Sequence, residues 1–247
     1  MNVVRDGINE QSKEIFSVLL AGQSNMAGRG DFGEVPPIEN ERCRVLRMGR
    51  WQAMHEPINP DRSSNEGCTR SGVGLGASFA DKLANSTGKT IGLIPCADGG
   101  TSIKQWQPGG EIFDYTVMVA RFAMRTSNLV GIIWHQGESD CKNYNPEEYR
   151  ELFLNTMRAF RRELGEDLPI VIGEICENIT KGWAPGESAK EMNALLHTLA
   201  DELGNCAIVS AEGLSLRADK LHFNSASYRI LGDRYFEKFA GLFNERV

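Results

Sequence analysis

Five short apolar segments recur along this 247-residue chain, and each is an unbroken run rather than an alternation of apolar and polar residues. Unbroken runs of this length are typical of strands that are covered on both faces. They span residues 15–21, 91–96, 130–134, 170–175 and 206–210. Helical patterns follow them at about 74–86, 112–127, 146–164, 188–203 and 225–244. This alternation predicts an α/β fold, a three-layer α/β/α sandwich on a parallel sheet of about five strands.

Residues 27–73 interrupt this rhythm between the first two expected strands. Within them, residues 43–48 and 51–54 flank a Gly-Arg pair, as in a short hairpin. Long excursions between core strands usually form binding loops or lids. The chain shows no internal repeat and no linker-like composition, and its length suits one large domain. We therefore expect a single domain over residues 1–247, with an insertion at 27–73.

Composition and charge argue against several classes of protein. Apolar residues make up 41% of the chain, which is ordinary for a globular protein, and the net charge of −6 disfavours a nucleic-acid partner. No apolar run reaches the roughly 18 residues of a transmembrane helix, and residues 1–7 lack the apolar core of a signal peptide. We expect a cytoplasmic protein without a membrane partner, whose six cysteines are reduced. Oligomeric state leaves no signal in the sequence.

Polar residues with catalytic potential follow four of the expected strands. These groups are Gly22-Gln23-Ser24-Asn25-Met26, Gly99-Gly100-Thr101-Ser102, His135-Gln136-Gly137-Glu138, and Asp219 with His222. Each has an ordinary explanation on its own, since Ser24 or Asn25 can cap a helix and His135 can satisfy a buried hydrogen bond. The carboxyl ends of parallel strands, however, share one edge of a sheet, so we expect the four groups to converge there.

Together these residues provide what acyl transfer requires: a nucleophile, a base, an orienting acid and oxyanion donors. Ser24 is the expected nucleophile, presented on a tight turn. His222 is the expected base. Asp219 lies three residues before it and can reach Nδ1 of the ring, which leaves Nε2 free to take a proton from the hydroxyl.

The four groups resemble the motif blocks of the SGNH (GDSL-like) hydrolase superfamily. The likeness is greatest to its sialate O-acetylesterase-like branch, which includes the acetylxylan esterases of carbohydrate esterase family 6, and it runs from about residue 15 to the last helix. It implies a flavodoxin-like fold and removal of O-linked acetyl groups from a carbohydrate, without a metal or other cofactor. Met26 stands where the G-x-S-x-G motif needs its second glycine, which disfavours an α/β-hydrolase.

The resemblance also implies roles for single residues. The superfamily usually places an oxyanion-hole asparagine in its third block, and the matching residue here is Gln136, as in the carbohydrate-esterase branch. We expect the Ser24 and Gly100 N–H groups and the Gln136 side-chain amide to hold the oxyanion. In this branch either Asp219 or Glu138 could serve His222 as its acid. We favour Asp219 for its short spacing, which leaves Glu138 as a second acid or a structural anchor.

The expected substrate is a small acetylated carbohydrate, such as an acetylated xylo-oligosaccharide. A sialic acid O-acetylesterase and a non-catalytic binder of acetylated glycans are the alternatives. Candidate contacts to the sugar are Gln23, Arg29 and Arg70. Trp106, Trp51 and Trp183 lie in loop-like segments, where an indole ring could either stack on a sugar or anchor the loop by partial burial.

Overall fold

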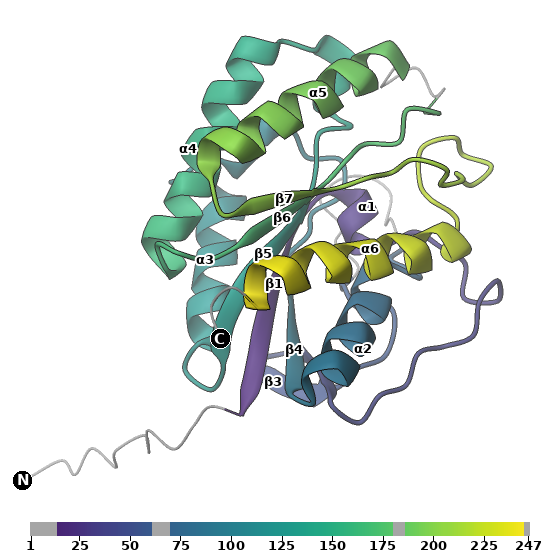
Figure 1. The fold of residues 1–247 in the computed structure, drawn as a ribbon, viewed down its shortest axis with the longest axis vertical. Coiled ribbons are helices and arrows are strands. Elements are labelled where there is room, and N and C mark those ends of the chain that lie inside the picture. The colour runs from purple at the N-terminus through teal and green to yellow at the C-terminus, as the bar shows by residue number, and fades with distance from the viewer. Residues whose placement is uncertain (1–13, 61–69, 180–185, 245–247) are drawn as a thin grey trace, which may run out of the picture.

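A seven-stranded sheet forms the centre of the protein (Figure 1). The structure, a computed structural model, describes residues 14–60, 70–179 and 186–244. The strands are β1 (Ile15–Gly22), β2 (Cys43–Arg47), β3 (Arg50–Ala53), β4 (Thr90–Pro95), β5 (Asn128–His135), β6 (Ile170–Gly173) and β7 (Cys206–Val209). Their order is β3-β2-β4-β1-β5-β6-β7. The five strands predicted from apolar runs are all present and parallel, in the flavodoxin-like order β4-β1-β5-β6-β7.

The expected count of about five strands is too low, because the insertion adds two. Its hairpin, β2 and β3, joins the sheet through parallel pairing of β2 with β4. Cys43 and Val45 in β2 are buried, whereas Arg44 and Arg47 are partly exposed. A strand that is partly exposed on one face gives an alternating pattern rather than an unbroken apolar run, so it escapes a search for buried strands.

Helices cover both faces of the sheet. They are α1 (Ser24–Ala27), α2 (Leu75–Thr87), α3 (Glu111–Ala123), α4 (Pro146–Leu164), α5 (Gly186–Leu203) and α6 (Ser225–Asn244), with the 3-10 turns η1 (Ile103–Trp106) and η2 (Asp140–Asn143). α2 packs against α6 on one face, and α4 packs against α3 and α5 on the other (Figure 1). The predicted three-layer sandwich is confirmed.

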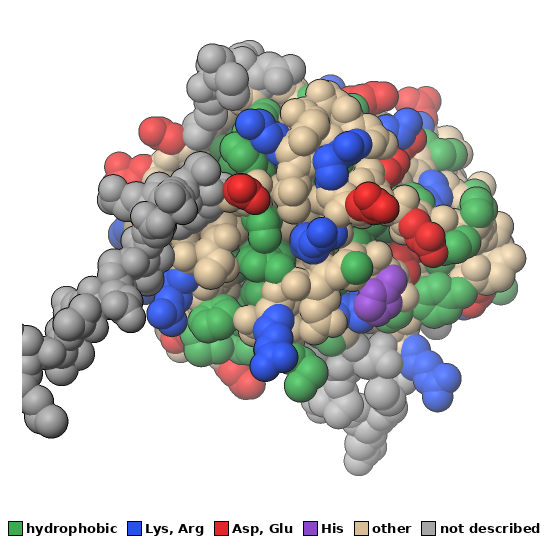
Figure 2. All heavy atoms as spheres, turned by 90° about the horizontal axis from the view of Figure 1, so that it is seen from below, with side chains coloured by type: hydrophobic (Ala, Val, Ile, Leu, Met, Phe, Trp, Pro, Cys, Tyr) green, Lys and Arg blue, Asp and Glu red, His purple; other side chains and the backbone are tan. Residues whose placement is uncertain are grey.

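The surface mixes charges of both signs. On the face shown in Figure 2, Lys and Arg side chains lie among Asp and Glu side chains, so that face carries no uniformly basic area. Among the described helices, none is long and apolar enough to cross a membrane. The five cysteines in the described part of the chain are free, and Cys68 lies outside it.

The turn that ends β1 depends on Gly22. Its φ is +133°, and a Cβ built there would lie only 2.2 Å from the carbonyl oxygen of His135. Glycine therefore lets β1 and β5 run close together at their carboxyl ends. The next residue, Gln23, donates its N–H to the same His135 oxygen at 2.9 Å, and the chain then turns into α1. Because the strand order reverses between β1 and β5, this is where such a sheet opens a crevice for ligands.

Candidate active site

Ser24, His222 and Asp219 form a continuous chain of contacts at this point of the sheet. Ser24 is the first residue of α1, and its Oγ lies 3.0 Å from Nε2 of His222. Nδ1 of His222 lies 2.9 Å from Oδ2 of Asp219. The fold thus brings together a hydroxyl, an imidazole and a carboxylate in the expected order, although 198 residues separate Ser24 from His222.

The loop that carries His222 is organised by the Asp219 carboxylate. Its Oδ1 accepts hydrogen bonds from the N–H groups of Leu221 and His222, both at 2.9 Å, while Oδ2 meets the His222 ring. Lys220, which lies between Asp219 and Leu221, adopts a left-handed φ of +58°. One side chain therefore shapes the turn and orients the imidazole.

Electrostatics favour an ionised Asp219 beside a neutral His222. Partial burial alone would raise the pKa of Asp219, but hydrogen bonds from the His222 and Leu221 N–H groups and from the His222 ring hold it at about 2. Burial lowers the pKa of His222 below its ordinary 6.5, against the raising effect of Asp219. A neutral imidazole is the form that can accept a proton from Ser24.

Asn25 ties the Ser24 turn to the His222 loop. Its Nδ2 donates to the carbonyl of Leu221, and its Oδ1 accepts from the N–H of Phe223, each at 3.4 Å. Leu221 and Phe223 are the two neighbours of His222, so the residue next to Ser24 holds the backbone on both sides of the imidazole. Asn25 stood in the sequence motif only as an alternative helix cap, because a contact with a loop about 200 residues away leaves no local signal.

Glu138 holds the side chain of Asn25 in place and does not contact His222. Its Oε1 accepts from Nδ2 of Asn25 at 2.6 Å and lies 3.4 Å from Nε2 of His135, which is itself fully buried. Burial would raise the pKa of Glu138, but the contacts with His135 and Asn25 outweigh it, and the pKa lies below 4.5. Tyr228 donates to Oδ1 of Asn25 at 2.7 Å from the other side. The structure therefore gives Glu138 the position of an anchor for Asn25.

A cavity of about 220 Å³ opens over Ser24, here called the Ser24 cavity. It is lined by Gln23, Ser24, Arg29, Gly99, Gly100, Glu138, Ser139, Leu221 and His222. Gly100 borders it with a left-handed φ of +78°, which glycine adopts without strain. Within the described residues, the N–H groups of Ser24 and Gly100 have no hydrogen-bond partner. Two backbone donors are thus available beside the Ser24 hydroxyl.

Gln136 does not take its expected place. Its side chain is fully buried and does not line the Ser24 cavity. Its Nε2 donates to Oδ2 of Asp140 at 2.5 Å and to the carbonyl of Thr101 at 3.1 Å, while its Oε1 accepts from the hydroxyl of Tyr149 at 3.1 Å. With both ends of the amide in use, Gln136 cannot donate directly to an oxyanion over Ser24.

Gln23 lies between Gln136 and the cavity. Its Oε1 accepts from the N–H groups of Gly137 and Ser139 at 3.4 and 3.3 Å and contacts Nε2 of Gln136 at 3.4 Å. Its own Nε2 has no hydrogen-bond partner in the described part of the protein. The side-chain amide that borders the Ser24 cavity is therefore that of Gln23, and Gln136 helps to orient it.

The remaining predicted sugar contacts divide into one that lines the cavity and several that do not. Arg29 is only 7% exposed and lines the cavity, with its Nη2 lying against Gly99. Arg70 is exposed and does not line it. Trp51 lies in β3, where its indole N–H donates to Thr126 at 3.1 Å. Trp183 falls outside the described residues.

Of the two roles that the sequence left open for Trp106, the structure favours the buried anchor over stacking on a sugar. The side chain is fully buried in η1, and its ring packs edge-on against Trp134 with centroids 4.9 Å apart. Its indole N–H donates to the hydroxyl of Thr101 at 2.9 Å. Because its one polar group has a hydrogen-bond partner inside the protein, the whole indole ring can be buried in the hydrophobic core.

The described part of the chain holds no cluster of three or more His, Cys, Asp or Glu side chains that could bind a metal ion.

Comparison with known proteins agrees with this geometry. The model of a family described as carbohydrate esterase, sialic acid-specific acetylesterase, matches residues 12–241. The chain belongs to this family. A probable carbohydrate esterase of Arabidopsis thaliana is 30% identical to this carbohydrate esterase over 235 residues, which cover 87% of this chain and 86% of the relative. The chain is thus a carboxylic ester hydrolase of the carbohydrate acetylesterase type, as the motif blocks implied.

Solved structures share the fold of this carbohydrate esterase. An Arabidopsis thaliana protein superposes with a TM-score of 0.79 at 28% identity, covering 93% of this chain and 99% of that one. NanS gives 0.77 at 18% identity, covering 95% and 99%. A carbohydrate acetylesterase from Xanthomonas citri gives 0.67 at 19% identity, covering 94% of this chain and 57% of that one. The SGNH-like fold is confirmed.

Proposed function

We propose that this carbohydrate esterase removes O-acetyl groups from a carbohydrate through an acetyl-enzyme formed on Ser24. The contact chain from Ser24 through His222 to Asp219, open to a cavity, carries the proposal. His222 takes the Ser24 proton as Oγ attacks the acetyl carbonyl, and Asp219 stabilises the imidazolium that forms. The imidazolium then protonates the departing sugar oxygen, and a water activated by His222 releases acetate.

The negative charge of the tetrahedral intermediate needs donors that are already in place. The free N–H groups of Ser24 and Gly100 provide two of them. Gln23 takes the third position that the sequence assigned to Gln136, since its amide borders the cavity. Losing one such donor typically costs about 3–4 kcal/mol, or roughly 10²–10³ in rate.

Acetylated xylo-oligosaccharides are the candidate substrates, because the cavity is small and its lining includes the hydrogen-bonding side chains of Gln23 and Ser139. The family description favours O-acetylated sialic acid as the second candidate. A non-catalytic binder is the weaker alternative, because binding alone does not require an imidazole 3.0 Å from a serine hydroxyl.

The test is acetate release from 4-nitrophenyl acetate and from acetylated xylobiose by the Ser24→Ala variant. We expect a loss of at least about 10³-fold in kcat, since the nucleophile is removed and only binding and oxyanion donors remain. Ser86→Ala is the matched control, because Ser86 is exposed on α2, away from the cavity. Full activity in Ser24→Ala would refute the proposed function.

A further inference from the structure

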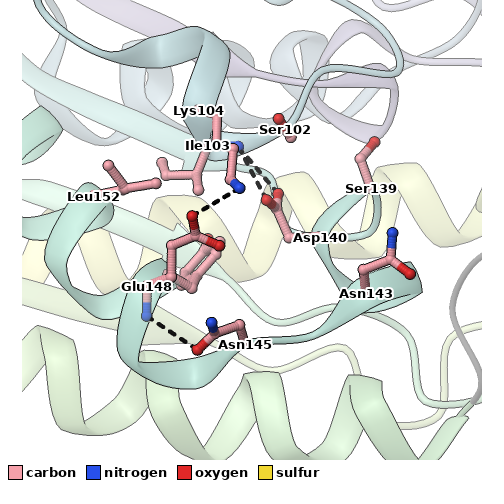
Figure 3. A pocket seen from close by; sticks show the side chains of 10 residues that line it. Ser102, Ile103, Lys104, Ser139, Asp140, Asn143, Asn145, Glu148 and Leu152 are labelled. Atoms are coloured by element: carbon pink, nitrogen blue, oxygen red, sulfur yellow. Dashed lines mark hydrogen bonds and ion pairs between the residues drawn. The ribbon is translucent and has the colours of Figure 1, made fainter.

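A second cavity lies directly beside the Ser24 cavity. It measures about 210 Å³ and lies between η1, η2 and the first turns of α4 (Figure 3). We call it the Asp140 cavity. Ser139 lines both cavities, and the loop that borders the first with Gly99 and Gly100 continues into Ser102, Ile103 and Lys104, which border the second. A molecule whose acetyl group sits over Ser24 would therefore extend into the Asp140 cavity.

The lining of the Asp140 cavity combines hydrogen-bonding groups with apolar surface. Ser102, Ser139, Asp140 and Asn143 lie on one side of it, and Ile103 and Leu152 on the other (Figure 3). Hydroxyls, amides and a carboxylate suit the hydroxyl groups of a sugar, and aliphatic side chains suit its C–H faces. Its volume lies below the roughly 300 Å³ at which drug-sized pockets begin, so it would hold about one sugar unit.

Three polar side chains here have hydrogen-bonding capacity to spare. Within the described residues, neither the Asn143 amide nor the Ser139 hydroxyl has a partner. Asp140 accepts from the N–H of Ile103 at 3.1 Å and from Gln136 at 2.5 Å, which leaves part of the capacity of its two oxygens unused.

The charges that line this cavity do not cancel. Lys104 is paired with Glu148 at 2.7 Å, so these two charges offset each other. Among the described residues no Lys, Arg or His lies within 4 Å of the Asp140 carboxylate. The cavity therefore carries a net negative charge. Arg29 lines the Ser24 cavity and does not line the Asp140 cavity.

From this geometry we propose that the Asp140 cavity is the sugar subsite and that it selects uncharged acetylated sugars over acetylated sugar acids. The inference rests on the proposed function. A sugar acid bound with its acetyl group over Ser24 would bring its carboxylate toward Asp140, and like charges at short range in a partly buried site repel. A neutral sugar meets no such repulsion there.

The experiment compares kcat/KM on three esters: acetylated xylobiose, 9-O-acetyl-N-acetylneuraminic acid and 4-nitrophenyl acetate. It is run at pH 8, because burial raises the pKa of Asp140 to about 6, and the carboxyl is then ionised. We expect the wild-type protein to prefer the neutral sugar ester by about 100-fold over the anionic one.

Two variants test the cavity itself. Asp140→Asn removes the charge with little change of shape, and we expect it to narrow the preference for the neutral sugar by about tenfold. Asn143→Ala should lower kcat/KM on acetylated xylobiose about tenfold more than on 4-nitrophenyl acetate, whose aryl group needs no sugar subsite. Asn143 is exposed, so this variant should fold even if Asp140→Asn does not. Glu151→Ala is the control variant, because Glu151 is exposed on α4 and lines neither cavity.

The outcomes separate this inference from the proposed function. Equal or better hydrolysis of the anionic ester by the wild-type protein would overturn the inference and leave the esterase function standing. So would an Asn143→Ala variant whose activities on the sugar ester and the aryl ester change in parallel. If the wild-type protein hydrolyses none of the three esters, the proposed function fails and the inference fails with it.

Discussion

Replacing Asp219 by Asn tests which carboxylate serves His222. The Asn oxygen can keep the two hydrogen bonds from the Leu221 and His222 N–H groups, both 2.9 Å long, so the loop should retain its shape. The amide NH₂ would then face Nδ1 of His222 and impose the tautomer with the proton on Nε2. That tautomer presents N–H to Ser24 and cannot accept its proton.

The expected fall in kcat of Asp219→Asn follows from the loss of the negative charge beside the imidazolium. Two unit charges about 4 Å apart attract by about 4 kcal/mol at an effective dielectric constant of 20, which corresponds to about 10³ in rate. The Asp219 side chain is 30% exposed, so solvent screening reduces this contribution, while the wrong tautomer adds to the loss. We therefore expect kcat to fall by about 10³-fold in Asp219→Asn.

The matched variant is Glu138→Gln. Its amide oxygen can still accept from Asn25, and the side chain does not contact His222, so we expect a loss of less than about tenfold in kcat. Both variants are assayed on 4-nitrophenyl acetate, and circular dichroism and thermal unfolding confirm that each is folded. A loss in Glu138→Gln as large as that in Asp219→Asn would refute the assignment of Asp219 as the partner of His222.

Three further predictions concern pH and stability. Because burial lowers the pKa of His222, kcat/KM should fall on the acid side with an inflection below pH 6.5, and an inflection above that value in the pH profile would contradict the geometry. Gln136→Ala removes the buried hydrogen bonds of the Gln136 amide with Asp140, the Thr101 carbonyl and the Tyr149 hydroxyl, so calorimetry should show a loss of about 3 kcal/mol in unfolding free energy, or roughly 6–12 °C in Tm; an unchanged Tm would argue against this buried network. Trp106→Ala should cost about 3–5 kcal/mol in urea unfolding, and unchanged stability with a raised KM would restore the sugar-stacking role.

The sequence predicted the parallel core well because its strands are buried on both faces. Such strands show themselves as unbroken apolar runs, and all five runs became neighbouring parallel strands. The hairpin strands β2 and β3 show no such runs, because both carry residues that are exposed or partly exposed to water. Their place in the sheet depends on the pairing of β2 with β4, in which Cys43 lies opposite Ile91. No local sequence pattern predicts that pairing.

Some residues of the candidate site could likewise be predicted from the sequence, and others could not. Ser24, His222 and Asp219 could be predicted because each belongs to a short local motif at a strand end. Gln136 could not, because being next to a strand end does not determine which way a side chain points, and here the amide turns toward Asp140. Trp106 lies in a loop-like stretch of sequence, but the packing of η1 against β5 decides its burial. The direction of a side chain and the depth to which it is buried depend on the packing of the whole molecule.

Because the hydrogen bonds of Asn25 join the Ser24 turn to the His222 loop, enzymatic activity reports whether these two parts of the chain are packed together. The nucleophile turn comes from the first strand, and the imidazole comes from a loop that follows the last strand, held by the contacts of Asn25 with Leu221 and Phe223. Local opening of that loop would separate the two halves of the site without unfolding the sheet. In rising urea, acetate release should therefore disappear before the circular dichroism of the sheet and helices changes, and an amino-terminal fragment that ends before Asp219 should be inert however well its strands assemble.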